Sequence, residues 1–182
     1  MKLKELDNSQ KELLHVFRNV EMNNNKLNEK VRRLSILVRR QCIPTSNIVA
    51  FTVVLDHEAT LGPLQVVKYN KILTKVGNAY DPRHGHANIP IKGIYLVAVT
   101  SMNHNNEDMH IELVRNDDLQ ESLIMPAGKL LDSMSQTLVF SLEKSDLVWV
   151  RVNNHNSYNG HRLYGTSIDF FNTFSAILLF PL

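Results

Sequence analysis

The chain has 182 residues, of which 43% are apolar and 21% are charged. This length suits one domain with an appendage, and the composition excludes a disordered or membrane-spanning chain. All seven glycines lie from Gly62 onward, which excludes a Gly-X-Y repeat and a glycine-rich phosphate loop. The net charge of +2 is unevenly divided: residues 1–41 hold ten Lys/Arg against five Asp/Glu, whereas residues 42–182 hold ten against thirteen.

Residues 1–41 are predicted to form one helix that associates with copies of itself. Apolar residues recur every seven positions, at Leu6, Leu13, Val20, Leu27 and Leu34. The position three residues before each of these is also mostly apolar, with Gln10 and Asn24 as polar exceptions. Alternating steps of three and four are typical of a parallel coiled coil, in which such polar residues fix the register. The alternative is a helix folded back on the domain that follows.

Several arginines, among them Arg32, Arg33, Arg39 and Arg40, accompany this seam. We expect them to flank the seam and face solvent rather than to bind nucleic acid or insert into a membrane. The helix is predicted to end before a linker at residues 42–47, because Pro44 disfavours helix at the residue before it. Cys42, the one cysteine, cannot form an internal disulfide; we interpret it as a free thiol, with a bridge to another chain as the alternative.

Residues 48–182 are predicted to form an all-β sandwich or barrel. Short runs rich in Val, Ile, Leu, Phe and Tyr alternate with polar turns, and no helical period interrupts them. About ten strands are expected, at 48–55, 65–68, 71–76, 86–91, 94–102, 109–115, 119–125, 136–142, 147–152 and 173–180. The last run is apolar on both faces, which favours a central strand with one face against the core and the other against a neighbouring subunit.

Several segments in this part of the chain resemble the globular head of the complement C1q family. They are residues 69–81, 85–90, 93–95, 114–116, 145–151 (around Trp149) and 173–181. The resemblance covers residues 48–182 in the expected order. It implies a ten-stranded jelly-roll sandwich, related to the tumour-necrosis-factor superfamily, that assembles as a homotrimer behind a coiled-coil stalk.

The long polar loop at residues 153–164 is the candidate ligand-binding site. Tyr158 and Tyr164 offer flat faces for stacking, and His161 and Arg162 offer hydrogen bonds, with Arg162 suited to a carboxylated sugar. The loop between His104 and His110 is the one candidate for calcium, without assigned ligands, and no other metal or cofactor is predicted. No catalytic constellation is found, so we do not expect an enzyme.

The resemblance implies a secreted, soluble binding protein, and the polar loop favours a lectin that recognises glycans or microbial surfaces in innate immunity. The alternative is a cytokine-like or structural extracellular adaptor whose head binds a protein receptor. The first residues alternate acids and bases where a secretory leader would be apolar. Secretion is therefore expected from the family resemblance and not from a leader in this sequence.

Overall fold

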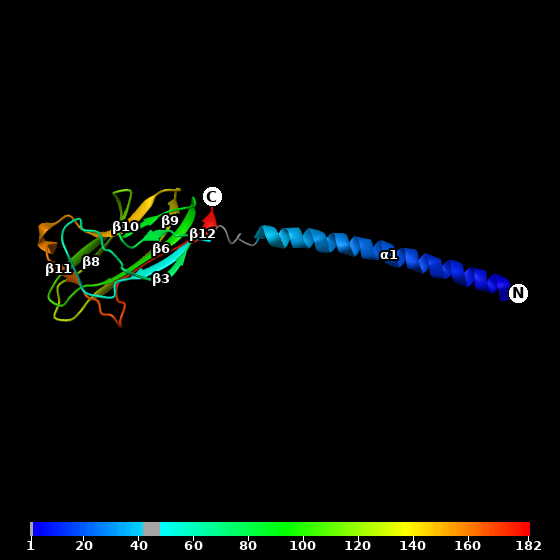
Figure 1. Cartoon of the computed structure of the whole chain (residues 1–182), viewed down its shortest axis with the longest axis horizontal. Helices are drawn as coiled ribbons and strands as arrows, with labels where there is room; N and C mark the ends of the chain where they lie inside the picture. Colours follow the sequence, from blue (N-terminus) through cyan, green and yellow to red (C-terminus); the bar gives the residue numbers. More distant parts are fainter. Residues whose placement is uncertain (1, 42–47) are drawn as a thin grey trace. The chain divides into compact units, whose positions relative to one another are not determined.

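The structure is a computed structural model that describes residues 2–41 and 48–182 and, within the first segment, the side chains of residues 13–36. The chain divides into two compact units, residues 1–44 and 45–182. The predicted linker at 42–47, with Cys42, lies outside the described residues. We describe the two units separately (Figure 1).

The first unit is the helix α1, Lys2–Gln41, as predicted. It contains neither Gly nor Pro, so no residue interrupts its backbone hydrogen bonds. The apolar seam is exposed along the part whose side chains are described: Leu13 is 60% exposed, Phe17 67% and Leu27 58%. A single helix cannot shield this stripe from water, so the exposed seam favours association with other helices.

The second unit is a sandwich of two five-stranded antiparallel sheets, the jelly-roll architecture that the sequence predicted. The first sheet has the strand order β3-β1-β12-β6-β9 and the second the order β4-β5-β10-β7-β8. A separate two-stranded sheet pairs β11 with β2. The bounds are β1 Ala50–Val54, β2 Ala59–Leu61, β3 Lys71–Val76, β4 Tyr80–Asp81, β5 His86–Asn88, β6 Gly93–Met102, β7 Met109–Arg115, β8 Asp118–Met125, β9 Ser133–Leu142, β10 Leu147–Val152, β11 His161–Leu163 and β12 Thr173–Pro181.

The core lies between the two five-stranded sheets and is centred on aromatic side chains. The ring of Phe51 lies 5.0 Å from that of Phe174 and 5.4 Å from that of Tyr80, and all three residues are at most 2% exposed. Tyr95 is also fully buried, and its hydroxyl donates to the Ile91 carbonyl at 2.6 Å. Aromatic pairs in these geometries add to the stabilisation that their buried area provides.

Gly93, at the start of β6, allows β12 to lie close beside this strand. A Cβ at this position would lie 2.4 Å from the carbonyl oxygen of Phe180 in β12, a distance that no side chain permits. Trp149 is 7% exposed but alternates with Val148 and Val150, which belong to the core. Its side chain therefore lies on the opposite face of β10, where its ring is 4.8 Å from that of His86.

The sequence misplaced a few short elements. The predicted strand at 65–68 is absent; this segment contacts β10 through one isolated bridge between Val66 and Arg151, and Leu64 before it has a φ of 59° that regular strand excludes. The two- and three-residue strands β2, β4 and β11 were not predicted. Strand β11 lies inside the segment that was expected to be loop, because its three residues pair with β2.

Candidate functional site

Four segments meet at one end of the sandwich, in the region of the β11 label in Figure 1. They are residues 55–58, 103–108, 126–132 and 153–172, called the hub loops below. Backbone hydrogen bonds connect them, for example from the Asn106 amide to the Gly128 carbonyl at 2.7 Å and from the His104 amide to the Arg162 carbonyl at 3.0 Å. The candidate ligand-binding residues of the sequence therefore belong to a larger connected surface.

Two fully buried asparagines hold the hub loops together. The side chain of Asn103 donates to the carbonyls of Glu107 at 2.6 Å and Pro126 at 3.0 Å, and it accepts from the Asp132 amide at 2.9 Å. Asn172 accepts from the Met102 amide at 2.9 Å and donates to the Tyr164 carbonyl at 2.6 Å. Each amide side chain satisfies backbone groups that would otherwise be buried without partners. The hub loops are thus positioned before any ligand arrives.

The sequence did not identify these asparagines as part of the site. Both resemble ordinary turn residues in composition, and their role depends on loops that are distant along the chain. The weak signal was position: each stands at the end of a long predicted strand, Asn103 after β6 and Asn172 before β12.

Arg162 connects three hub loops through its guanidinium group. Its Nε donates to Glu107 Oε1 at 2.8 Å, its Nη1 donates to Glu58 Oε1 at 3.1 Å, and its Nη2 lies 3.1 Å from His104 Nδ1. Burial alone would raise the pKa of Glu107, but the hydrogen bonds from Arg162 hold that pKa below its ordinary value. Two carboxylates thus already occupy the group that the sequence assigned to an acidic ligand.

The other three predicted residues lie in the same region. His161 Nδ1 donates to the Asp108 carbonyl oxygen at 2.7 Å. The Tyr158 ring packs against the core and makes edge contacts with the rings of His110 at 5.9 Å and His161 at 6.2 Å. The Tyr164 ring lies 5.5 Å from that of Phe171 and 6.0 Å from that of His104, the imidazole that also contacts Arg162. Tyr158 and His161 are thus in direct contact, whereas Arg162 and Tyr164 are connected through His104.

The carboxylates of the predicted calcium loop are engaged within the protein. Glu107 is bound to Arg162, and Asp108 Oδ1 lies 3.2 Å from His161 Nδ1. Among the described residues, no group of three or more His, Cys, Asp and Glu side chains is arranged to hold a metal ion. Both acidic side chains of this loop therefore already have a partner within the protein.

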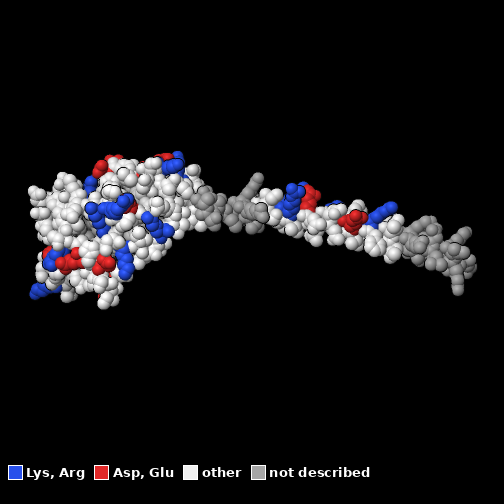
Figure 2. Space-filling model, viewed as in Figure 1, with Lys and Arg blue, Asp and Glu red and all other residues white. Residues whose placement is uncertain are grey.

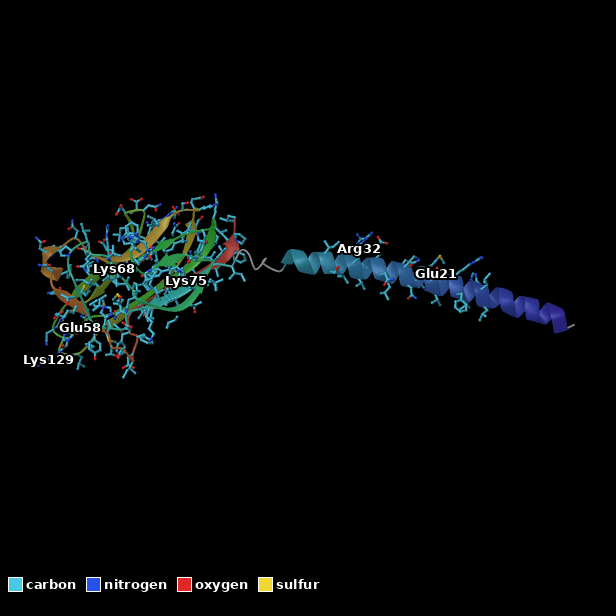
Figure 3. The ribbon with its side chains drawn as sticks, viewed as in Figure 1. Glu21, Arg32, Glu58, Lys68, Lys75 and Lys129 are labelled. Atoms are coloured by element: carbon cyan, nitrogen blue, oxygen red, sulfur yellow. The ribbon has the colours of Figure 1, made fainter. Side chains whose placement is uncertain are left out.

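The hub loops carry more acids than bases. They hold six Asp/Glu residues against Lys129 and Arg162, a net charge of −4 with histidines neutral. Figure 2 shows red side chains at this end with blue ones beside them, and Figure 3 labels Glu58 and Lys129 there. Two apolar side chains stand out into solvent on the same loops, since Leu130 and Ile168 are each 82% exposed. An acidic surface with exposed apolar tips suits a basic ligand better than an acidic one.

A second exposed feature is an apolar row across the first sheet, on the face opposite the core. The strand registers align one residue from each of the five strands, namely Val76, Ala50, Ile177, Leu96 and Val139. Ile177 is 44% and Val139 62% exposed, and Phe180 on β12 is 64% exposed. A row of this kind across a whole sheet marks an interaction surface. From the sequence, Tyr95 and Phe180 are each either core residues or residues that pack at a subunit interface. The structure buries Tyr95 in the core and leaves Phe180 exposed, so only Phe180 is available to such an interface.

A polar hollow of about 430 Å³ lies away from the hub loops. It is lined by Lys75, Tyr80 and the turn that follows β4. Within that turn Arg83 donates to both carboxylate oxygens of Asp81 at 3.3 Å, and His84 Nδ1 lies 2.9 Å from the same carboxylate. These bonds pair the charged side chains of the turn with one another. No helix within the described residues is long and apolar enough to span a membrane.

A family model described as the C1q domain matches residues 50–179. Among curated proteins, the chain is 28% identical to mouse complement C1q tumor necrosis factor-related protein 3 over 114 residues, which cover 62% of this chain and 44% of that protein. It is 24% identical to one of the subunits of the mouse complement C1q subcomponent over 136 residues, which cover 73% and 51%. The chain thus spans about half the length of the curated relatives it matches.

Two solved structures share the fold of the head. The globular domain of zebrafish complement 1qA protein matches with a TM-score of 0.61 at 15% identity and covers 74% of this chain and 99% of that one. Murine APRIL matches with a TM-score of 0.57 at 13% identity and covers 73% and 100%. At such identities the likeness concerns the fold alone.

Proposed function

This chain belongs to the C1q domain family, and on that premise we propose that it is a secreted, homotrimeric recognition protein that binds a ligand and does not catalyse a reaction. The observation that carries the proposal is the apolar row of Val76, Ala50, Ile177, Leu96 and Val139. Water contact with such a row is unfavourable, and the same holds for the exposed seam of α1. Association of three chains through both surfaces would bury them together.

The hub loops are the proposed ligand surface. Loops on a rigid sandwich are common binding platforms, and Asn103 and Asn172 fix these loops in advance, which lowers the entropic cost of binding. The net charge of −4 and the exposed Leu130 and Ile168 support a protein ligand that presents basic side chains around an apolar contact. Three copies in one trimer would add avidity through effective concentration.

Within this proposal Arg162 is a positioning residue. The sequence suggested that it pairs with an acidic sugar, but its guanidinium is bound to Glu107 and Glu58. A ligand carboxylate would have to displace both of these partners and approach an acidic surface. We therefore assign Arg162 the task of holding residues 58 and 107 against β11.

Lectin-type recognition of glycans is the second candidate, and the surroundings of Tyr158 favour it. Its ring is in edge contact with three imidazoles, those of His110, His155 and His161. An aromatic face bordered by hydrogen-bonding groups suits a neutral sugar, which stacks its apolar side and bonds through its hydroxyls. On this second proposal the ligand would be neutral and not sialylated.

The test compares two variants of the full chain on a panel of cationic proteins, neutral glycans and sialylated glycans. The first variant, Leu130→Ser with Ile168→Ser, should lose binding to cationic proteins, because it removes the apolar contact from side chains that are largely exposed. The second, Tyr158→Ala, should lose binding to neutral glycans if the protein is a lectin. Ile124→Ser is the control, since Ile124 is 53% exposed on β8 and outside the hub loops.

The results separate the two candidates. Loss of cationic-protein binding in the first variant alone supports the protein ligand. Loss of glycan binding in the second alone supports the lectin. If both variants bind the whole panel as the wild type does, the hub loops are not the ligand surface.

A further inference from the structure

The helix α1 carries an excess of positive charge that its predicted role in association does not require. Residues 13–36 contain five Lys/Arg against Glu21 and Glu29, a net charge of +3, while residues 42–182 carry −3. Figure 2 shows the blue side chains along this helix, and Figure 3 labels Arg32 and Glu21 on it. The excess lies on exposed side chains, where it is available to an anionic partner.

Three of these bases share one face of the helix. Lys26, Lys30 and Arg33 are spaced by four and three residues, which places them one above the other over about 10 Å at 1.5 Å per residue. Together with Glu29 they line a shallow depression of about 200 Å³. With Val31 and Leu34 at heptad positions a and d, the three bases occupy positions c, g and c. Position c points away from the seam and position g borders it. Lys26 and Arg33 therefore stay accessible when the helices associate, and Lys30 lies at the edge of the seam.

The charges of this face are only partly balanced within the helix. Arg33 pairs with Glu29 four residues earlier. Lys30, in contrast, has two basic residues, Lys26 and Arg33, among the positions three and four residues away along the helix. None of these positions holds an acid. Like charges at these spacings destabilise a helix. An anion lying along the face would relieve this repulsion, which links the pattern to ligand binding.

The residue types identify the chemical class of the anion. Lysines are point charges on flexible stems, suited to sulfate and carboxylate groups without a fixed geometry. Residues 13–36 contain one Phe, Tyr or Trp residue, Phe17, and it lies on the seam. The nucleobases of a single-stranded nucleic acid would therefore find no aromatic side chain to stack on at this face. The three bases form a line along the helix axis, which matches an extended polymer. We infer that the face of Lys26, Lys30 and Arg33 binds a linear sulfated polysaccharide.

The inference is independent of the ligand proposed for the hub loops. It places a second binding surface on the other unit of the chain, with the opposite sign of charge. In a trimer, three such faces would lie around the helix axis, so that contacts that are weak individually act together on a surface that carries many polymer chains. Even a monomer would retain the face, although with lower apparent affinity.

The test measures elution of the full-length protein from immobilised heparin in a salt gradient. The variant Lys26→Gln, Lys30→Gln, Arg33→Gln should elute at clearly lower salt than the wild type. The charge-matched control Lys68→Gln, Lys75→Gln, Lys144→Gln removes three positive charges from the head and should elute with the wild type if the face on α1 is responsible. The variant Lys26→Arg, Lys30→Arg keeps the positive charge and should elute at the same salt concentration as the wild type.

Circular dichroism and sedimentation show whether each variant keeps its helix and its mass. If the α1 variant keeps both but elutes with the wild type, the inference is overturned. If the α1 variant loses its helix, the single variant Lys30→Gln is compared with the wild type instead, and it must elute at lower salt. Duplex DNA that competes more strongly than heparin at equal charge would overturn the assignment to a sulfated polysaccharide. None of these outcomes depends on the ligand of the hub loops.

Discussion

At the residue scale, the hub loops depend on polar side chains that bind backbone rather than ligand. Asn103 and Asn172 are both 0% exposed, and together they serve five backbone groups from distant parts of the chain. Arg162 has a similar effect nearer the surface through its contacts with Glu107 and Glu58. The residues that shape this site are therefore distinct from those that would contact a ligand.

Asn103→Ala should destabilise the head by about 1–3 kcal/mol, because it leaves buried backbone groups without hydrogen-bond partners. Thermal denaturation gives the loss of stability. Hydrogen exchange should also become faster at residues 126–132, which Asn103 anchors. Asn154→Ala is the control, because Asn154 is exposed; a variant at Asn103 as stable as this control would contradict the assigned role.

Glu107→Gln should lower stability at pH 7 by about 1 kcal/mol, since it breaks a partly exposed ion pair with Arg162. The native pKa of Glu107 lies below its ordinary value of 4.5, so the ionised pair stabilises the fold above that value. Stability from this group is lost as the pH falls through the lowered pKa. Urea denaturation at pH 7 and at pH 3 should show a difference between variant and wild type that shrinks at the lower pH. A difference that stays constant would exclude the pair as its source.

At the scale of single elements, strong periodicity made the longest segments predictable. Three strands, β3, β7 and β10, begin and end where the sequence placed them, and α1 follows from five heptads. The short strands β2, β4 and β11 have too few residues for an alternating pattern and form only because a partner strand lies beside them. Local sequence does not carry that information.

The candidate site was predictable in part for the same reason. Composition located the polar segment at 153–164, and its four predicted residues do lie among the hub loops. Composition could not reveal that Arg162 would meet Glu107 and Glu58, because these acids are separated from it by 55 and 104 positions. The sequence shows that a residue is charged, but the fold decides which residue it pairs with.

Asn24 within α1 should control the register and number of associated helices. Asn24→Val should raise the thermal midpoint of the helix, because it removes a polar group from an apolar seam, and should broaden the distribution of oligomers. Circular dichroism gives the midpoint and sedimentation velocity the distribution. Leu27→Asn is the opposite control and should lower the midpoint. A single sharp oligomer in Asn24→Val would contradict the role in register.

At the scale of the whole molecule, two apolar surfaces are exposed on a single chain, one on each unit. The seam of α1 and the row across the first sheet both gain from burial at about 25 cal/mol per Å² of apolar area. Because the surfaces are on separate units of one chain, each can associate by itself, and association through one raises the effective concentration of the other. Two separate apolar surfaces would therefore stabilise the proposed trimer.

The full chain should sediment at three times its mass of 20.8 kDa. Ile177→Asp and Leu27→Asp should each weaken the trimer, because each places a charge in one of the two apolar surfaces. The double variant should dissociate to monomers at micromolar concentration. Ile124→Asp, exposed on the second sheet, should leave the mass unchanged. A wild-type monomer, or a double variant that remains trimeric, would refute this mode of assembly.

The central place of β12 in the first sheet governs the order of events during synthesis. Strand β12 lies between β1 and β6, so the sheet cannot be completed until the last strand has left the ribosome. By then α1 has long been exposed, and nascent chains on neighbouring ribosomes can already join through their heptads. The heads would then fold while tethered at high local concentration. A chain that stalls or ends before β12 would occupy a place among the associated helices without a complete first sheet, and would leave its full-length neighbours in a defective assembly.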